Sequence, residues 1–265
     1  LPGAVYEIIA AEDIITQDGT VRNQKGNVVD TVTTDENGTA VSRELYLGKY
    51  EVREITAPYG MVLNGEIHCV ELVYAGQNVA VTETATSFEN ERQKVEISLV
   101  KSIEQNERFG IGTNGEMKNI SFGLFAAEEI VSASGTSIPA NGLVEIISLN
   151  EDGTAKIKTD LPFGSYYVQE LATDSHYKLS DTKYPVTFGY ASQDTAVVKI
   201  AVNGGNAVEN KLIYGSVSGK KIDENGDSLG GALIGIFRTS DGEFTKENAL
   251  MTATSQKDGS FSFEK

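Results

Sequence analysis

The sequence predicts an all-β protein made of tandem β-sandwich units. Asp-Gly and Asn-Gly dipeptides occur ten times in the 265 residues, and such dipeptides favour the tight turns of β-hairpins. Between them lie short segments in which apolar and polar residues alternate, such as KYEVREI (49–55) and KVEISLV (94–100). This alternation is typical of strands with one buried face. No long amphipathic helix is predicted, and AAEDII (10–15) indicates one or two helical turns at most.

The same order of motifs recurs along the chain, which indicates internal repeats. AAED (10–13) returns as AAEE (126–129), TTDENGTA (33–40) as SLNEDGTA (148–155), and LGKYEVRE (47–54) as FGSYYVQE (163–170), and a further copy starts at GGALIGIFRTSDG (230–242). The spacing predicts a first repeat at 1–92 that lacks its first strand, a complete second repeat at 93–212, and the N-terminal part of a third repeat at 213–265. Head-to-tail β units with such short linkers favour a semi-rigid rod.

The charge balance excludes several classes of partner. The chain has 22 Lys plus Arg against 38 Asp plus Glu, a formal net charge of -16. Such a field repels phosphate backbones and anionic lipid, so we expect neither nucleic-acid binding nor membrane association. No apolar run reaches the roughly 20 residues of a membrane span, and the first residues lack the basic start of a signal peptide. The sequence is therefore typical of a mature or trimmed chain.

A single cysteine, Cys69, rules out an intrachain disulfide. Exported proteins are the usual place for disulfides, so the chain is either intracellular or stabilised by another covalent link. The polar residues predicted inside the second repeat favour the second alternative.

Three predicted inward-facing rows of the second repeat each include a polar residue. Alternate residues of a strand share a face. The rows are Ile97, Leu99 and Lys101; Tyr166, Val168 and Glu170; and Val208, Asn210 and Leu212. An unpaired buried lysine or glutamate is costly, so we expect Lys101, Glu170 and Asn210 to act on one another.

These residue types fit a single covalent reaction. Burial lowers the pKa of a lysine and raises that of a glutamate, which leaves a nucleophilic amine beside a protonated carboxyl group. The Lys101 amine could attack the side-chain carbonyl of Asn210, with Glu170 as catalyst and proton shuttle, and expel ammonia. The product is an isopeptide cross-link. The reaction happens once per molecule and needs no cofactor, so we do not expect an enzyme with turnover.

A plainer interpretation stays open for the same residues. Lys101 could extend its amine to solvent from a strand end, Glu170 could face solvent, and Asn210 could simply end a strand. Recurrence of the pattern in the first repeat favours the cross-link.

The flanking repeats have equivalent residues but not a full set. The first repeat has Glu54 and Asn90, and the strand that should carry its lysine would precede residue 1. The third repeat has Lys221 and ends before any partner. We choose Lys221 over the adjacent Lys220 because its parity with Val217 and Gly219 fits an inward row.

The motif set resembles the collagen-adhesin B-type (Cna-B, prealbumin-like) domains of Gram-positive surface adhesins and pilin subunits. The resemblance rests on Leu-x-x-Gly-x-Tyr-x-Val-x-Glu followed by Ala-Pro (Leu45 to Pro58), on the Thr-x-Asp-x-Asn-Gly-Thr-Ala turn, and on the closing Glu-Asn. It implies Ig-like, prealbumin-like sandwiches, with Lys101 and Asn210 bonded, Glu170 catalytic, and Glu54, Asn90 and Lys221 equivalent. The second repeat departs from the pattern by an insert at 104–119 and by Thr173-Asp174 in place of Ala57-Pro58.

The resemblance implies a structural stalk or pilus-shaft segment of a bacterial surface protein. Its partners would be neighbouring domains or subunits of the same fibre, and its place would be extracellular and cell-wall-anchored, with the anchor outside this segment. The alternative is an adhesin module in which the domain tips or the 104–119 insert bind a host matrix protein or glycan. Fold likeness alone does not choose between them.

The remaining candidate sites have simpler explanations. Asp223–Asp227 could be a calcium loop, but the distal glutamate of such a loop is not at the required spacing, so we favour an acidic hairpin turn. His68 and His176 have no ligand cluster around them, and we expect surface or strand positions for both. Cys69 is expected to be a small packed apolar residue. The sequence predicts no metal and no cofactor.

Overall fold

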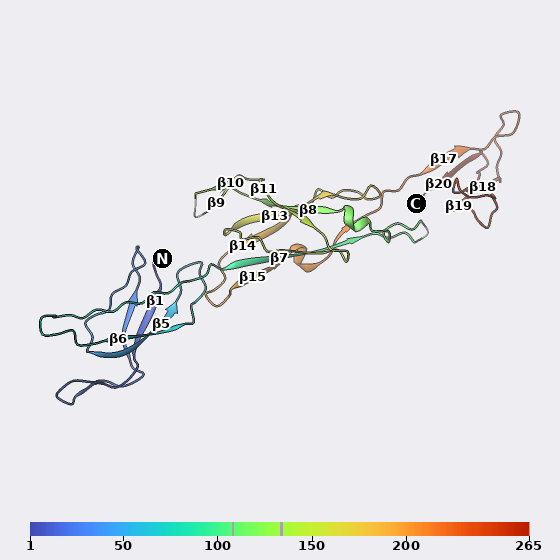
Figure 1. The fold of residues 1–265 in the computed structure, drawn as a ribbon. Coiled ribbons are helices and arrows are strands. Elements are labelled where there is room, and N and C mark those ends of the chain that lie inside the picture. The colour runs from blue at the N-terminus through green and yellow to red at the C-terminus, as the bar shows by residue number, and fades with distance from the viewer. Residues whose placement is uncertain (108, 133–134, 265) are drawn as a thin grey trace. The chain divides into compact units, whose positions relative to one another are not determined.

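The all-β prediction is confirmed. A computed structural model describes residues 1–107, 109–132 and 135–264, and the elements found in them are strands and two short 3-10 helices (Figure 1). The chain forms two compact units. One comprises Leu1–Asp174 with Leu179–Glu209, and the other comprises Ser175–Lys178 with Asn210–Lys265. The helical turns predicted at 10–15 do not form, because β1 continues to Ala10 and strand β2 (Ile14–Ile15) follows a short bend.

The first repeat is organised around one antiparallel sheet. Its strand order is β4-β1-β5-β6. The strands are β1 (Val5–Ala10), β4 (Val28–Thr33), β5 (Gly48–Thr56) and β6 (Ile67–Leu72). A small apolar core lies against it, formed by Ile8, Ala10, Ile14, Val29 and Tyr50. The apolar residues of alternate parity therefore build one buried face, as the sequence pattern requires.

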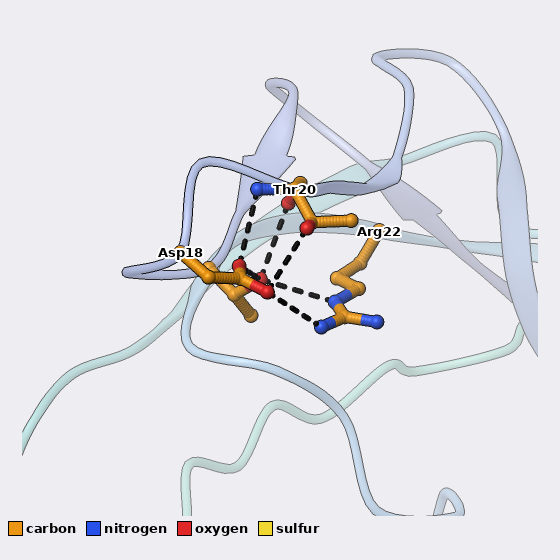
Figure 2. A network of polar contacts seen from close by, with 4 residues as sticks. Asp18, Thr20 and Arg22 are labelled. Carbon is orange, nitrogen blue, oxygen red and sulfur yellow. Dashed lines mark hydrogen bonds and ion pairs between the residues drawn. The ribbon is translucent and has the colours of Figure 1, made fainter.

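The ribbon of β2 and β3 (Val21–Asn23) shows how the Asp-Gly turns are held. Asp18 accepts hydrogen bonds from the Thr16 hydroxyl at 2.6 Å and from the Thr20 backbone N–H at 3.1 Å. Arg22 forms an ion pair with the same carboxylate at 3.3 Å (Figure 2). These hydrogen bonds, that of Thr16 first, lower the pKa of Asp18. The turn is thus closed by its own side chains.

The second repeat has two sheets that face a common core. One sheet has the order β11-β8-β13-β14, and the other the order β12-β7-β15, with β16 also paired to β7. The strands are β7 (Lys94–Ile103), β8 (Ser121–Ala126), β11 (Leu143–Ser148), β12 (Thr154–Ile157), β13 (Gly164–Ala172), β14 (Tyr184–Phe188), β15 (Val197–Ala201) and β16 (Val208–Asn210). Short additions are β9 (Ile130–Val131), β10 (Ser137–Ile138) and the 3-10 helices η1 (Glu116–Asn119) and η2 (Val202–Gly205).

Register shows that the two repeats share one plan. Tyr6 of β1 lies opposite Glu54 of β5, and Phe122 of β8 lies opposite Glu170 of β13. A tyrosine four residues before each glutamate makes the same hydrogen bond. The Tyr50 hydroxyl donates to the Tyr46 carbonyl, and the Tyr166 hydroxyl donates to the Pro162 carbonyl. Equal geometry at equivalent positions supports the internal repeat.

The second unit contains the strands of the third repeat. β17 (Val217–Lys220) pairs with β20 (Ser260–Phe263), and β18 (Leu233–Ile236) pairs with β19 (Met251–Thr254). In β17, Val217 lies opposite Phe263, just as Ile97 of β7 lies opposite Ile157 of β12. β17 is therefore the counterpart of β7.

Two glutamine side chains bind backbone groups at the boundary of the first and second repeats, and that of Gln193 joins the two repeats. The amide of Gln193 accepts from the Ala57 N–H at 2.9 Å and donates to the Ile55 carbonyl at 3.2 Å. Gln93 is buried, and its amide binds backbone groups of Ala191, Ser192 and Thr195. Both amides satisfy backbone groups that irregular segments would otherwise leave unpaired.

The helices found in residues 1–107, 109–132 and 135–264 include none that is long and apolar enough to cross a membrane.

Candidate functional site

Strand β7 carries Lys101 into the core of the second repeat. Ile97, Leu99 and Lys101 alternate along the strand, and all three are buried. The parity prediction for this row agrees with the structure. A lysine in an aliphatic row loses its hydration, so its surroundings must supply polar partners.

Glu170 of β13 is the charged partner of this lysine. The Lys101 Nζ lies 3.8 Å from the Glu170 Oε1, and both side chains are completely shielded from solvent. The second carboxylate oxygen, Oε2, accepts a hydrogen bond from the Ser180 N–H at 2.9 Å. Neither residue is at the surface, so the plainer interpretation with Lys101 and Glu170 turned to solvent is wrong.

The Lys101 amine also contacts two backbone carbonyls. It donates to the Val208 carbonyl at 3.1 Å and to the Ser102 carbonyl at 3.0 Å. Val208 belongs to β16, so the lysine bridges from its own strand to that strand. These contacts fix the amine on the inner side of the sheet.

Burial lowers the pKa of Lys101 from 10.5 to about 8, and the charges of Glu170 and then Glu209 oppose this shift without cancelling it. The direction follows from desolvation, which disfavours the ammonium form. Near neutral pH a small but useful fraction of this amine is therefore unprotonated. An unprotonated amine is the nucleophilic form.

Asn210 ends strand β16, and its side chain is buried. β16 pairs with β7, the strand that carries Lys101. Asn210 is also the residue at which the long segment of the second compact unit begins. The joining of Lys101 to Asn210 stays a prediction.

The structure brings Glu54 and Asn90 of the first repeat together. The Asn90 Nδ2 donates to the Glu54 Oε2 at 2.8 Å and to the Val62 carbonyl at 3.0 Å. The Glu54 carboxylate also accepts from the Asn64 N–H at 2.7 Å and, at 3.4 Å, from the Tyr6 hydroxyl. Burial and the neighbouring Glu54 raise the pKa of Tyr6 to about 12, so this hydroxyl stays a donor.

In the third repeat the structure favours Lys221 over Lys220 as the counterpart of Lys101. The Lys221 N–H donates to the Gly259 carbonyl as that of Lys101 does to Gly153. Each lysine also donates its Nζ to the carbonyl of the next residue, at 2.6 Å for Lys221. Lys220 is exposed and Lys221 is half-buried.

Sequence reasoning missed the backbone donors that hold the two glutamates. Asn64 and Ser180 each follow their glutamate by ten residues and donate their N–H groups to it. The residue types differ because only the main chain takes part. The equal spacing between each glutamate and its donor was the one signal in the sequence that could have indicated these hydrogen bonds.

The expectation that Cys69 is a packed apolar residue is wrong, because Cys69 is exposed. On β6 it shares a face with the exposed Ile67, whereas the half-buried His68 lies on the other face. The His68 ring stacks on Phe88 with centroids 4.0 Å apart. The period of two therefore assigns the cysteine to the outer side of the strand.

The Asp223–Asp227 segment is a side-chain-closed turn. The Asp223 carboxylate accepts from the N–H groups of Asn225 and Asp227, both at 2.9 Å. The hairpin-turn interpretation therefore describes its geometry.

The insert at 104–119 is organised by a buried acid. Glu116 accepts from the N–H groups of Gly112 at 2.8 Å and Asn114 at 2.7 Å. The adjacent Met117 packs against the core of the second repeat. The insert is therefore attached to the sandwich that holds Lys101.

The fold and the repeated glutamate sites define a class of protein: tandem prealbumin-like β-sandwiches with buried polar groups in their cores. The family of the SpaA prealbumin-like fold domain matches residues 1–87 and 108–205. The chain belongs to this family.

Individual proteins are also similar to this chain. The trypsin-resistant surface T6 protein of Streptococcus pyogenes serotype M6 is 26% identical over 147 residues, which are 54% of this chain and 26% of that protein. The Bacillus anthracis TIE protein has a TM-score of 0.62 at 21% identity, over 100% of this chain and 40% of that chain. GBS52, the minor pilin of Streptococcus agalactiae, has a TM-score of 0.29 at 17% identity, over 81% of this chain and 85% of that chain. The chain spans less than half the length of the first two.

Proposed function

We propose that this chain is a structural segment of a bacterial surface fibre, stabilised by an isopeptide bond that forms spontaneously between Lys101 and Asn210. The observation that carries the proposal is the fully buried Lys101–Glu170 pair at 3.8 Å. A buried charge pair is a poor source of stability by itself, because desolvation offsets the attraction. A reaction that consumes the lysine charge removes that cost.

The proposed reaction balances without a cofactor. The Lys101 ammonium first loses a proton to solvent, and the free amine then attacks the Asn210 Cγ, so that a C–N bond forms as the bond to Nδ2 breaks. Glu170 takes the second proton from the attacking nitrogen and gives it to the leaving nitrogen, which departs as ammonia. The position of Glu170 beside the amine suits both transfers.

The proposed location is extracellular, on a Gram-positive cell surface, within a longer protein anchored outside this segment. Membership of the prealbumin-like family and likeness to a trypsin-resistant surface protein support this. The partners proposed for the chain are neighbouring domains or subunits of the same fibre. A covalent bond between β7 and the end of β16 would hold the second repeat closed under pulling or proteolysis, because forced unfolding is governed by the barrier that the bond raises.

The first prediction concerns intact mass. Denatured wild-type chain is expected to weigh one ammonia less than its sequence mass, because the bond expels ammonia. Lys101→Ala and Asn210→Ala should each restore the full mass for their sequences. Lys156→Ala, at an exposed lysine paired with Glu96, is the matched control and should keep the deficit. A full sequence mass for the wild-type chain would refute the cross-link.

The second prediction concerns pH. Chain purified unfolded in urea and refolded by dilution should form the bond faster as pH rises, about tenfold per pH unit below pH 8, and level off above it; this follows from the lowered pKa of Lys101. Acid-quenched samples analysed by mass give the rate. A flat rate between pH 6 and 8 would contradict the role of the free amine.

The lowered pKa of Lys101 also determines how the stability of a chain without the bond changes with pH. The pKa of Lys101 is about 8 in the folded state against 10.5 as the ordinary value. Between these values the unfolded chain binds more protons, so the stability of the Asn210→Ala variant should increase with pH across this window.

A further inference from the structure

The connection between β7 and β8 starts beside one reacting side chain and ends beside the other. β7 ends at Ile103, shortly after Lys101. The next strand, β8, places Phe122 opposite Glu170. The connection contains the insert at 104–119, which sets the second repeat apart from the shared motif pattern. The position of this segment can therefore influence both the lysine and the glutamate.

The C-terminal part of the insert is held together by a buried acid. The Glu116 side chain is buried, and its two carboxylate oxygens accept the N–H groups of Gly112 at 2.8 Å and of Asn114 at 2.7 Å. Hydrogen bonds to a charged acceptor are stronger than neutral ones. They close residues 112–119 into one structure, which we call the Glu116 loop, and they fix the position of the next residue, Met117.

Met117 connects the Glu116 loop to the turn that holds Lys101. It is half-buried and packs against the core of the second repeat. Its Cε lies 3.2 Å from the point where a Cβ on Gly153 would stand. The Gly153 carbonyl accepts the Lys101 N–H at 2.8 Å, and a Cβ on Gly153 would overlap the Lys101 carbonyl oxygen. Met117 thus packs on the turn that sets the main-chain position of the lysine.

Asn119 connects the other end of the loop to the segment that follows Glu170. The Asn119 Nδ2 donates to the Asp174 Oδ2 at 2.7 Å, and Asp174 comes shortly after the end of β13 at Ala172. Ile120, the residue after Asn119, is buried in the core. The loop is therefore attached at two places, one beside the lysine and one beyond the glutamate. A loop attached in this way limits how far their two strands can separate.

We propose that the Glu116 loop positions the Lys101–Glu170 pair, and that Met117 is the residue through which it acts. This inference rests on the cross-link proposed above. The loop would hold the lysine strand against β13, so that both side chains stay fully shielded at their separation of 3.8 Å. Small displacements of reacting groups are costly in rate. Because Met117 acts through the main chain of Lys101, it is a positioning residue and not a catalytic one.

Loosening of the loop is expected to change the titration of the lysine as well as the rate. Burial disfavours the ammonium form of Lys101, and the two carboxylates that act on it, Glu170 on β13 and Glu209 on β16, favour that form. Met117→Ala would leave space beside Gly153 that water can enter. Hydration stabilises the ammonium, so the pH at which bond formation reaches half its maximal rate should rise. Each unit of this rise slows the reaction about tenfold at neutral pH.

The test follows bond formation by intact mass after refolding from urea, over a pH series that spans the lowered and the ordinary pKa of lysine. Met117→Ala and Glu116→Gln should each raise the midpoint by about half a unit to one unit, which corresponds to a reaction about three- to tenfold slower at neutral pH. Met117→Leu keeps the volume and should restore the wild-type profile. Lys118→Ala is the matched control, since Lys118 lies in the same loop and pairs with the exposed Glu151 at 3.0 Å, and it should leave the midpoint unchanged. A Met117→Ala chain that is less stable but keeps the wild-type midpoint would overturn the proposal.

A second measurement separates this proposal from the cross-link itself. In the Asn210→Ala chain the proposed bond cannot form, and the titration of Lys101 can be followed by the carbon-13 NMR signal of its Cε, assigned by its loss in Lys101→Ala. If wild-type chain shows no ammonia deficit but Met117→Ala raises the pKa of Lys101 in this background, the loop positions a buried ion pair and only the bond proposal fails. If the deficit is present and neither measurement changes in Met117→Ala, the bond stands and the loop has no positioning role.

Discussion

Replacing Glu170 by alanine is expected to stop bond formation and to give the largest loss of stability of any single substitution at this site. The bond would close a loop of roughly 110 residues, which in the chain-entropy account contributes about 5 kcal/mol to the free energy of unfolding. The substitution also leaves the buried Lys101 without its carboxylate, and breaking a buried pair from one side costs about 3 to 5 kcal/mol. Urea unfolding monitored together with intact mass measures both effects.

Glu170→Gln separates proton transfer from packing. Glutamine keeps the volume of the side chain and an oxygen for the Ser180 N–H, which lies 2.9 Å from the carboxylate, but it cannot shuttle a proton. Bond formation should slow by about 10² to 10⁴, the usual contribution of a general acid–base group. Glu96→Gln is the matched control, since Glu96 pairs with the exposed Lys156 and Lys158, and it should react at the wild-type rate. A Glu170→Gln chain that bonded as fast as wild type would exclude Glu170 from catalysis.

The sequence predicted well those features that depend on local alternation. The row Tyr166, Val168 and Glu170 is buried as its parity requires, and the first-repeat glutamate Glu54 is buried at the equivalent place. Cys69 was assigned by residue type instead of parity, and that assignment was wrong. A period of two says which side a residue faces, whereas a preference for burial is only an average over proteins.

The features that could not be predicted are non-local. Residues 39–46 begin with the same Thr-Ala pair as β12, yet they form no strand. A strand exists only if another strand pairs with it, and the partner of β12 is β7, which lies more than fifty residues away in the sequence. The hydrogen bond from the Ser180 N–H to Glu170 escapes sequence reasoning for a related reason. Main-chain donors carry no signature in the side chain that presents them.

Comparison of the repeats gives the site a physical interpretation. Both glutamates accept a hydrogen bond from a backbone N–H ten residues further along, so the main chain helps to hold each carboxylate in place. Preorganised groups act without reorganisation at the moment of reaction. The second repeat adds a lysine with a lowered pKa, and the first presents its asparagine to the carboxylate. Together the two repeats display the lysine–glutamate and the asparagine–glutamate contacts of the proposed site.

Gly153→Ala is expected to disturb the same site through the backbone. Gly153 has a φ of +80°, and a Cβ at this position would overlap the Lys101 carbonyl oxygen and crowd the Met117 side chain. The Gly153 carbonyl also accepts the Lys101 N–H at 2.8 Å, so relief of the overlap must move the strand that carries the lysine. We expect a loss of at least about 3 kcal/mol in the free energy of unfolding and slower bond formation, since overpacking adds to the cost of a left-handed residue.

Gly19→Ala isolates the conformational part of that cost. Gly19 has the same φ of +80°, and nothing lies within 4 Å of its added Cβ, so its substitution should cost only about 1 to 2 kcal/mol. Both changes are best compared in the Asn210→Ala background, where urea midpoints report folding without a cross-link, and then in the wild-type chain, where intact mass reports the bond. Equal losses at the two glycines would show that the Lys101 carbonyl moves aside freely, and that the turn at Gly153 does not help to position the lysine.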